Sequence, residues 1–344
     1  MTNDLTSIFA GKKILITGGT GSLGQALTKR LLEIGANTIR IFSRNESKQI
    51  EMEDNIKDDR LKFFIGDVRD FQRLLKAVEG ADFVFHTAAL KHVPKIEYNP
   101  FEAIKTNVVG SQNVIDASLD ANVDKVVYVG TDKAVSPLNT YGATKLLAEK
   151  LFVSANNYFT REKTKFFAVR YGNVLGSSGS VIPLFIKQIK SKQKITITNS
   201  NMTRFSLTMS EALDFILHTI DIGKGSEIFI PKLRAYSITD VKSVLKETLE
   251  NTGEEEIGIR PGEKLHEEMI SNDESMNTLE FKDYFTIIPN SDLIQWSKKK
   301  YLKSHKEGKI CKSNFSYNSK NNVNFLNVSE IKKLIHINLS DIQE

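Results

Sequence analysis

The chain has 344 residues, 40% of them hydrophobic and 26% charged, so it can bury the core of one large domain or of two closely associated ones. A single cysteine, Cys311, excludes an internal disulfide and favours a reducing cytoplasmic location. The sequence has no apolar run near the roughly 20 residues that span a bilayer, and its first residues lack the apolar core of a signal peptide. We therefore expect no membrane insertion.

The net charge of +5 is unevenly distributed. Residues 298–312 contain seven lysines and one glutamate, so the rest of the chain is close to neutral. A basic segment can attract nucleic acid, but only Tyr301 interrupts this one as an aromatic residue, and no nucleic-acid-binding motif accompanies it. We interpret the segment as a solvated surface or loop and expect no nucleic-acid partner.

Short apolar runs alternate with amphipathic runs through the first half of the chain. The apolar runs predict buried strands at residues 13–17, 38–43, 61–67, 81–89, 124–131 and 165–174. Between them, the periodicity of residues 23–35 and 71–81 predicts helices. Buried strands that alternate with helices indicate the α/β class, with a doubly wound parallel sheet of the Rossmann type.

The pattern becomes more mixed after residue 175. We expect residues 8–175 to form the Rossmann domain, with residues 207–235 returning to its sheet. Residues 176–206 and 236–344 are expected to form a smaller, mixed substrate-binding lobe and tail. Within that lobe, residues 237–251 predict a helix that begins with a Ser or Thr cap.

A glycine-rich sequence directly follows the first predicted strand and leads into the first helix. It satisfies both G-x-G-x-x-G and the wider G-x-x-G-x-x-G spacing. Glycine lets a pyrophosphate reach the helix N-terminus, where free N–H groups and the helix dipole favour an anion. A tight turn without a ligand is the alternative, but the strand–turn–helix context favours a dinucleotide site. Its expected residues are Gly18, Gly19, Thr20, Gly21, Ser22, Leu23 and Gly24.

The residues after the second strand bear on which dinucleotide binds. An acidic residue there would hold the ribose hydroxyls of NAD, whereas this chain reads FSRNESK. Because an arginine can hold a 2′-phosphate through paired charged hydrogen bonds, NADP is favoured over NAD. Arg44 could instead be an ordinary surface arginine. The expected cofactor contacts here are Ser43, Arg44, Asn45 and Lys48, with Asp67 and Val68 placed to line the adenine.

Tyr141 and Lys145 lie one helical turn apart and therefore project from the same face. The charge of Lys145 is expected to stabilise a phenolate and to lower the pKa of Tyr141 from about 10. A tyrosinate can take a proton from a substrate hydroxyl while a nicotinamide takes the hydride. The pair alone is common by chance, but here it follows a dinucleotide loop and Thr131, at the end of the sheet where ligands bind.

Several segments together resemble the extended short-chain dehydrogenase/reductases. They are TGGTGSLG (17–24), HTAALKHVPKIEYNP (86–100), GTDKAVSPLNTYGATK (130–145), VRYGNVLGSSGSVIP (169–183), MTRF (202–205) and RPGEKLHEEMIS (260–271). Within that family they are most similar to the inverting UDP-N-acetylglucosamine 4,6-dehydratases, which begin pseudaminic acid synthesis. The resemblance runs from about residue 10 to the tail.

The resemblance implies that C4 of the sugar is oxidised, water leaves across C5 and C6, and the hydride returns to C6. NADP would stay tightly bound and be recycled. Asp132 would be the acid for the C6 hydroxyl, Lys133 the base at C5, and Tyr141 the base at the C4 hydroxyl. Lys145 would bind the nicotinamide ribose and Thr131 would orient the substrate, UDP-N-acetylglucosamine.

Lys133 stands where dehydratases that retain the C5 configuration usually have glutamate, so the resemblance implies the inverting branch. To act as a base, Lys133 needs a pKa well below about 10.4, through burial or a cationic neighbour. A contact to substrate phosphate or a purely structural contact is the alternative role.

Further contacts follow from the resemblance. Ala88, Lys91 and Val174 would contact the cofactor. Arg204 and Arg260 suit a diphosphate because guanidinium groups bind phosphate oxygens in pairs, and Glu263 would orient Arg260. The full substrate-binding set is His86, Lys91, Asn173, Ser178, Gly179, Ser180, Val181, Ile182, Arg204, Arg260 and Glu263. The His and Cys residues show no metal-ligand spacing, so we expect no metal site.

Three alternatives stay open. A UDP-HexNAc C4-epimerase would use Tyr141 and Lys145 and leave Asp132 and Lys133 unexplained. A retaining 4,6-dehydratase would share most of the site. A non-catalytic NADP-sensing regulator would share the fold, from which function cannot be read. The resemblance also implies a homo-oligomer, either a dimer or a hexamer.

Overall fold

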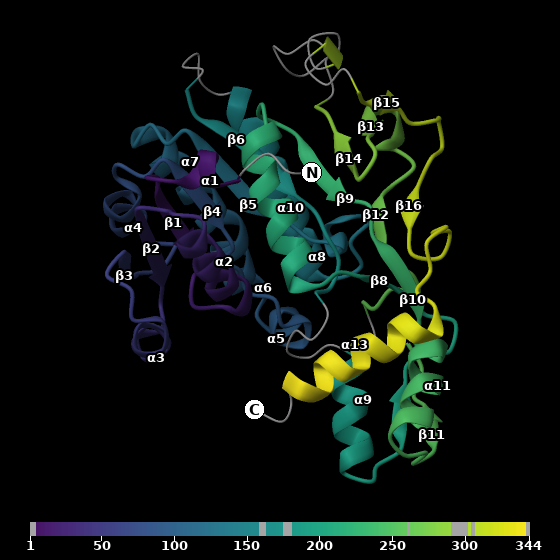
Figure 1. Cartoon of the computed structure of the whole chain (residues 1–344). Helices are drawn as coiled ribbons and strands as arrows, with labels where there is room; N and C mark the ends of the chain where they lie inside the picture. Colours follow the sequence, from purple (N-terminus) through teal and green to yellow (C-terminus); the bar gives the residue numbers. More distant parts are fainter. Residues whose placement is uncertain are drawn as a thin grey trace.

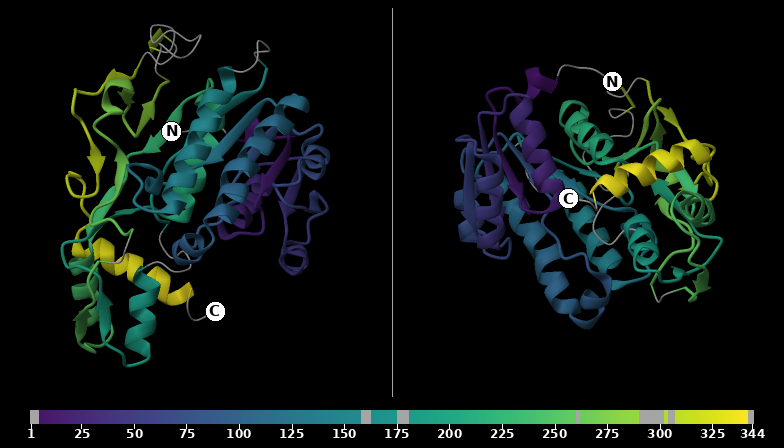
Figure 2. Two further views of the ribbon diagram at one scale, coloured as in Figure 1. Left: turned by 180° about the vertical axis from the view of Figure 1, so that it is seen from behind. Right: turned by 60° about the horizontal axis from the view of Figure 1, so that its bottom comes forward.

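A computed structural model describes residues 5–157, 163–174, 181–259, 262–289, 302–303 and 307–341. A large twisted sheet carries helices on both faces (Figure 1). A smaller lobe with α9 (Val181–Lys190), α11 (Ile238–Thr248) and α13 (Val328–Asp341) lies at the bottom of this view, and Figure 2 shows the same arrangement from two other directions.

The six strands predicted in the first part of the chain all form. They are β1 (Lys13–Thr17), β2 (Thr38–Ser43), β3 (Leu61–Ile65), β4 (Phe83–His86), β5 (Lys125–Val129) and β6 (Lys165–Val169). They pair in parallel in the order β3-β2-β1-β4-β5-β6, and β9 (Ile228–Pro231) joins beside β6. The central strands are buried on both faces, as parallel sheets require. The predicted α/β class is confirmed.

The strand order reverses between β1 and β4, which are neighbours in the sheet. At such a point the connections leave toward opposite faces and open a crevice at the carboxyl ends of the strands. The glycine loop follows β1, Ala88 follows β4, and residues 131–133 follow β5. The fold therefore brings the predicted cofactor and catalytic segments to one edge.

The helices around the sheet begin at local signals. On one face α2 (Ser22–Glu33) packs against α10 (Met209–Ile222), and on the other α7 (Gly110–Asp120) packs between α4 (Phe71–Val78) and α8 (Thr140–Ser154). Side chains of Asn45, Asp70 and Asn139 cap α3 (Glu46–Ile56), α4 and α8. Short helical pieces are α1 (Leu5–Phe9), α5 (Val93–Tyr98), α6 (Pro100–Ala103), the π-helical η1 (Ile104–Val109) and the 3₁₀ turns η2 (Asp132–Ala134), η3 (Ala155–Asn157) and η4 (Ser275–Asn277).

The smaller lobe has its own hydrophobic cluster, to which α9, α11 and α13 contribute Phe185, Val241 and Ile331. The helix predicted at residues 237–251 forms as α11, and Ser237 caps it. Short strand pairs complete this half: β7 (Ile195–Ile197) with β11 (Glu254–Glu256), β8 (Thr203–Ser206) with β10 (Arg234–Ser237), and β12 (Glu268–Ile270) with β16 (Tyr317–Asn318).

Residues 228–231 return to the main sheet as expected, but the segment 236–344 is not all lobe and tail. Strand β14 (Tyr284–Ile287) pairs antiparallel with β9, and β13 (Thr278–Glu280) and β15 (Lys309–Ile310) continue the sheet beyond it. Without these strands β9 would leave a row of unpaired backbone groups at a sheet edge. The expected boundary is therefore wrong for residues 278–287 and 309–310.

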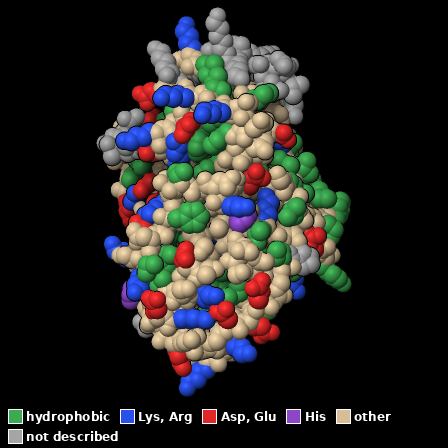
Figure 3. All heavy atoms as spheres, turned by 90° about the vertical axis from the view of Figure 1, so that its right-hand side faces the viewer, with side chains coloured by type: hydrophobic (Ala, Val, Ile, Leu, Met, Phe, Trp, Pro, Cys, Tyr) green, Lys and Arg blue, Asp and Glu red, His purple; other side chains and the backbone are tan. Residues whose placement is uncertain are grey.

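The basic segment lies partly outside the described residues. Its described lysines, Lys303, Lys309 and Lys312, are exposed. On the face of the molecule that lies at the right of Figure 1, described basic and acidic side chains are interspersed (Figure 3). Among the described helices, none has the length and apolar character to cross a membrane.

A buried ion-pair cluster ties α8 to the C-terminal half. Arg170, directly after β6, is fully buried and donates to both carboxylate oxygens of Glu149 on α8, at 3.0 and 2.6 Å. It also donates to both carboxylate oxygens of Glu274, before η4, and to the carbonyl oxygen of Met269 on β12. Every side of the guanidinium is therefore engaged by a different part of the chain.

We expect Arg170→Met to lower the free energy of unfolding by about 3–5 kcal/mol, because it leaves the carboxylate of Glu149 buried without its cation. Denaturant unfolding followed by circular dichroism measures the change. The control is Arg234→Met, which breaks an exposed pair with Glu330 and should cost much less. Equal losses in the two variants would show that the buried cluster contributes no more to the free energy of unfolding than an exposed ion pair does.

Candidate active site

A cavity of about 510 Å³ follows the carboxyl edge of the sheet. Thr131 and Asn173 line it together with Tyr141 and Lys145. Nearly the whole expected cofactor set also lines it: Gly18, Thr20, Gly21, Ser22, Leu23, Gly24, Ser43, Arg44, Asn45, Lys48, Asp67, Val68, Ala88, Lys91 and Val174. Gly19 is the exception. A Cβ there would meet Ile41 at 2.9 Å, so this glycine allows the loop to pack on β2.

The glycine loop fits a dinucleotide because side chains at two of its positions would fill or distort the cradle. Gly18 has a φ of +70°, and a Cβ on it would lie 2.8 Å from the backbone of Ala88. A Cβ on Gly24 would lie 2.5 Å from the Cα of Gly19. Helix α2 begins at Ser22, so its free N–H groups are at the cavity wall, where a pyrophosphate is favoured.

The end of the cavity that lies beside β2 and β3 is rich in cations. Asp67 lies 3.7 Å from Arg44 and 2.7 Å from Arg69. Burial acts to raise the pKa of Asp67, but the hydrogen bonds and charge of Arg69, aided by Arg44, outweigh it and lower that pKa. Ser43 and Asn45 are held by local hydrogen bonds to Gln49 and the Lys48 N–H. Arg44, whose side chain is 53% exposed, is the donor best able to reach a ligand.

Lys145 is held at the base of the cavity. Its Nζ donates to the carbonyl oxygen of Val129 at 2.9 Å and lies 4.3 Å from the centre of the Tyr128 ring. Burial lowers the pKa of Lys145 to about 7, although the Glu149 carboxylate acts to raise it.

The expected effect of Lys145 on Tyr141 is not what the structure shows. Burial raises the pKa of Tyr141 above its ordinary value, and Asp132 adds to this. The cation that opposes the rise is Lys133, and a hydrogen bond with Thr131 also acts to lower the pKa of Tyr141. Lys145, whose own pKa is lowered by burial, is not among the groups that dominate the pKa of Tyr141, so the predicted lowering by Lys145 is wrong.

Asp132 and Lys133 form a direct pair just beyond Thr131. The Lys133 Nζ lies 3.1 Å from Asp132 Oδ1, and Thr131 Oγ1 donates to the same carboxylate oxygen at 2.8 Å. Asp132 is buried, whereas the Lys133 side chain is 31% exposed. Neither lines the cavity, but Lys133 Nζ reaches its wall by donating to Asn173 Oδ1 at 2.9 Å.

The prediction of a depressed pKa for Lys133 is also wrong. Burial acts to lower its pKa, but the carboxylates of Asp132 and Glu267 outweigh burial and raise it. Lys133 is therefore an ammonium group in this structure, in an ion pair with its expected acid partner.

A second cavity, of about 160 Å³, shares Asn173 and Val174 with the first. Val181, Ile182, Arg204 and Glu263 line it, so these expected substrate residues are brought together. Glu263 pairs with Arg204, 3.3 Å from its Nη2. Arg260, its expected partner, lies outside the described residues, as do Ser178, Gly179 and Ser180.

The expected role of His86 in substrate binding is wrong. His86 ends β4 but turns into the core, where its ring nitrogens contact Thr17 Oγ1 at 2.7 Å and Ser111 Oγ at 2.9 Å. Its ring stacks on Phe152, and burial lowers its pKa to about 3. A neutral histidine with both nitrogens engaged behind the cavity wall has no free group for a substrate. Lys91, expected beside it, does line the larger cavity.

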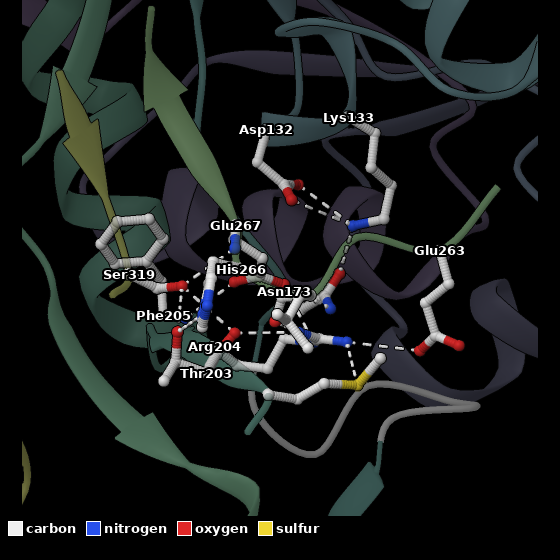
Figure 4. A network of polar contacts seen from close by, with 12 residues as sticks. Asp132, Lys133, Asn173, Thr203, Arg204, Phe205, Glu263, His266, Glu267 and Ser319 are labelled. Atoms are coloured by element: carbon white, nitrogen blue, oxygen red, sulfur yellow. Dashed lines mark hydrogen bonds and ion pairs between the residues drawn. The ribbon is translucent and has the colours of Figure 1, made fainter. Parts of the chain in front are cut away.

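Two residues of the site escaped the sequence interpretation. Asn107, in the π-helical η1, binds both backbone groups of Leu90 and the Thr144 hydroxyl, so it fixes the loop after β4 against α8. Glu267 lies behind Asn173 in the network of Figure 4. Its segment contains three other glutamates, Glu263, Glu268 and Glu274, and spacing alone does not select among them. Among the described residues, no group of three His, Cys, Asp or Glu could hold a metal.

A Tyr–Lys pair beside a glycine-lined cavity on a parallel sheet defines an enzyme of the short-chain dehydrogenase/reductase class. The sequence comparisons place it more narrowly. The profile of the polysaccharide biosynthesis protein family matches residues 14–289, and the chain belongs to this family.

Individual relatives cover nearly the whole chain. The chain is 46% identical over 332 residues to the UDP-N-acetylglucosamine 4,6-dehydratase (inverting) of Campylobacter jejuni, covering 96% of this chain and 98% of the relative. It is 39% identical to the UDP-glucose 4-epimerase of Rickettsia conorii, with 98% of each covered. The X-ray structure of Pen from Bacillus thuringiensis superposes with a TM-score of 0.85 at 40% identity, covering 96% of this chain and 98% of that one.

We expect Gly24→Ala to weaken binding of the nicotinamide dinucleotide by about ten- to a hundredfold, because overpacking against the Gly19 backbone costs about 1–3 kcal/mol in the loop. Calorimetric titrations with NAD and with NADP measure the affinity. Lys29→Ala, an exposed position on the same helix, is the control and should bind normally. Unchanged affinity in Gly24→Ala would mean that the loop does not form the pyrophosphate cradle.

Proposed function

We propose that this chain catalyses the NADP-dependent 4,6-dehydration of UDP-N-acetylglucosamine with inversion at C5, giving a UDP-4-keto-6-deoxy-HexNAc. The observation that carries the proposal is the Asp132–Lys133 pair, 3.1 Å apart, in the turn that precedes the helix of Tyr141. The full-length similarity to the Campylobacter dehydratase supports it.

Dehydration across C5 and C6 needs a ketone at C4 first, because only the ketone makes the C5 hydrogen acidic enough for a protein base. When bound, the nicotinamide supplies this chemistry by accepting a hydride from C4 and returning it to C6. Tyr141 takes the proton of the C4 hydroxyl, and the charge of Lys133 favours its phenolate. Lys145 holds the nicotinamide ribose, and Thr131 orients the sugar.

As an ion pair, Asp132 and Lys133 are in the wrong protonation states, since the base must be uncharged and the acid must carry a proton. One proton transfer across their 3.1 Å contact, from Nζ to Oδ1, produces both required forms. Lys133 then takes the C5 proton, and Asp132 protonates the departing C6 hydroxyl, so that water leaves. The step ends with the original ammonium and carboxylate, and no proton is gained or lost by the pair. When the hydride returns to C6, C5 takes a proton from solvent on the face opposite Lys133, and Tyr141 releases to solvent the proton that it took from the C4 hydroxyl.

A C4-epimerase is the main alternative, and the Rickettsia relative carries that name. Epimerisation needs a base at the C4 hydroxyl and a hydride acceptor, which Tyr141 and the cofactor cavity provide. Epimerisation does not require a buried acid that is paired with an amine, as Asp132 is with Lys133. That pair equally disfavours a cofactor-sensing regulator, for which the Tyr141, Asp132 and Lys133 set would have no task.

NADP rather than NAD is proposed from the charge at the end of β2. Arg44 is half-exposed there, and Lys48 lines the same end of the cavity. The acidic side chain at this end, Asp67, is already engaged by Arg44 and Arg69. A 2′-phosphate suits this donor set better than free ribose hydroxyls.

The biological setting is proposed from the same resemblance. We expect the product to enter synthesis of a surface glycan of the pseudaminic acid type, in the cytoplasm, where UDP-sugars and NADP are available. We also propose a homo-oligomer, a dimer or hexamer. In its support, Tyr98 on α5, Phe101 on α6 and Leu147 on α8 are exposed apolar side chains on helices that contact one another.

The first test is a proton NMR time course with UDP-N-acetylglucosamine in D₂O. We expect a 4-keto-6-deoxy product with deuterium and inverted configuration at C5. Lys133→Met should lower the rate by about 10²–10⁴-fold because the C5 base is lost, whereas Lys62→Met, exposed on β3, should not. A C4 epimer formed without loss of water would refute the dehydratase assignment.

Arg44→Ala is expected to weaken NADP binding by about ten- to a hundredfold, since a charged hydrogen-bond pair is worth about 1.5–3 kcal/mol, and to leave NAD binding nearly unchanged. Both affinities are measured by calorimetric titration. Lys76→Ala, which removes one exposed charge from α4, is the control. An equal loss for both dinucleotides would show that Arg44 does not read the 2′-phosphate.

A further inference from the structure

Glu267 is a buried carboxylate next to the proposed base, 3% exposed and immediately before β12. Its Oε2 accepts from the Phe205 backbone N–H at 2.7 Å, and its Oε1 accepts from Asn173 Nδ2 at 3.2 Å. The other end of the Asn173 amide accepts from Lys133 Nζ. A continuous chain therefore runs from Asp132 through Lys133 and Asn173 to Glu267 (Figure 4).

The direction of each hydrogen bond in this series depends on whether Glu267 and Lys133 are charged. An ionised Glu267 only accepts, so Asn173 must turn its NH₂ toward Glu267 and its carbonyl oxygen toward Lys133. A carbonyl oxygen suits an ammonium group, which only donates. This is the arrangement that the structure shows, with Lys133 charged.

Protonation of Glu267 would reverse the arrangement. The Phe205 N–H already donates to Oε2, so the added proton must reside on Oε1 and donate toward Asn173. The amide of Asn173 then has to present its oxygen to Glu267 and its NH₂ to Lys133. An NH₂ facing Nζ repels an ammonium group and suits the lone pair of a neutral amine.

The groups that face Glu267 come from several elements. Asp132 and Lys133 lie in η2, Arg204 in β8 with its Nε 3.7 Å from Oε1, and Tyr236 in β10. Lys264 approaches along the segment before β12. Burial and the Asp132 charge raise the pKa of Glu267 to about 7, against the opposing charges of Lys133 and Arg204.

We propose that Glu267 is a positioning residue that sets the protonation state of Lys133 through the side-chain amide of Asn173. The inference rests on the proposed role of Lys133 as the base. An ionised Glu267 holds Lys133 as the ammonium that binds Asp132, and a protonated Glu267 favours the neutral amine that can take the C5 proton. Glu267 lines neither cavity, so it acts through Asn173 and not on the substrate.

The decisive variant is Glu267→Gln. Its amide oxygen can accept from Phe205, which turns its NH₂ toward Asn173 and makes the arrangement of the protonated acid permanent. Because the pair must keep its one proton for Asp132 to deliver to the C6 hydroxyl, the rate of water loss falls with rising pH through the pKa of Lys133. In E267Q this fall should move to lower pH by about one unit, since a carboxylate near an amine raises its pKa by about that amount. A lower rate or stability with the fall unmoved would reduce Glu267 to a structural role and overturn the proposal.

Two further variants distinguish an effect that is transmitted by the Asn173 amide from a through-space effect of the Glu267 charge. Glu268→Gln removes the adjacent carboxylate, which binds the Ser136 hydroxyl instead, and should keep the wild-type profile. In an Asn173→Ala background, the added E267Q change should shift the profile clearly less. An undiminished shift would show that the charge acts through space and would exclude the amide route.

A measurement without turnover distinguishes this inference from the proposed function. Protein labelled with ¹³C at lysine Cε is titrated by NMR, and Lys133→Gln identifies the Lys133 resonance. Its midpoint should be lower in E267Q than in wild type. If that shift appears in a protein that does not dehydrate UDP-N-acetylglucosamine, the proposed function is wrong and control by Glu267 stands. If wild type dehydrates but the midpoint does not move, only this inference is overturned.

Discussion

Burial of the Arg170 guanidinium is the constraint on which the site depends. A cation without solvent must be surrounded by acceptors, and here they come from Glu149 on α8 and from Glu274 and Met269 in the C-terminal half. The helix of the tyrosine and the strand that follows Glu267 are thereby fastened to the end of β6. The proposed acid Asp132, the proposed base Lys133 and Tyr141 are therefore held in place by a contact that touches none of them.

Burial also decides the electrostatics at the reaction end. The pKa values of Tyr141, Lys133, Lys145 and Glu267 are each set by the balance between burial and the charges nearest to the group. Burial lowers the pKa of Lys145 to about 7 against the opposing charge of Glu149, whereas Asp132 and Glu267 outweigh burial and raise the pKa of Lys133. The two lysines thus differ in character although they lie in the same loop-to-helix segment.

The strands of the sheet and the glycine loop at its edge were predictable from sequence. The strands follow from local periodicity, and the loop needs glycine where a side chain would clash. Gly24 is constrained by the backbone of Gly19 in the same loop, and β1 to β6 by runs of buried residues. His86, the Tyr141 pKa and Glu267 were not predictable. Whether a strand-end histidine faces the core depends on one residue of register. The pKa of Tyr141 depends on how deeply the phenol is buried, and Glu267 depends on contacts with Asn173 and Phe205, which are far from it in the chain.

Asn173 and Val174 form a wall common to both cavities. A ligand that orders this wall from one side changes the free energy of binding on the other, and the coupling must be the same in both directions. With the dinucleotide and the sugar nucleotide in the two cavities, as proposed, retention of one and capture of the other are parts of a single equilibrium. An enzyme that regenerates its cofactor within each turnover gains from this arrangement, because an arriving substrate can itself tighten the hold on the cofactor it is about to use.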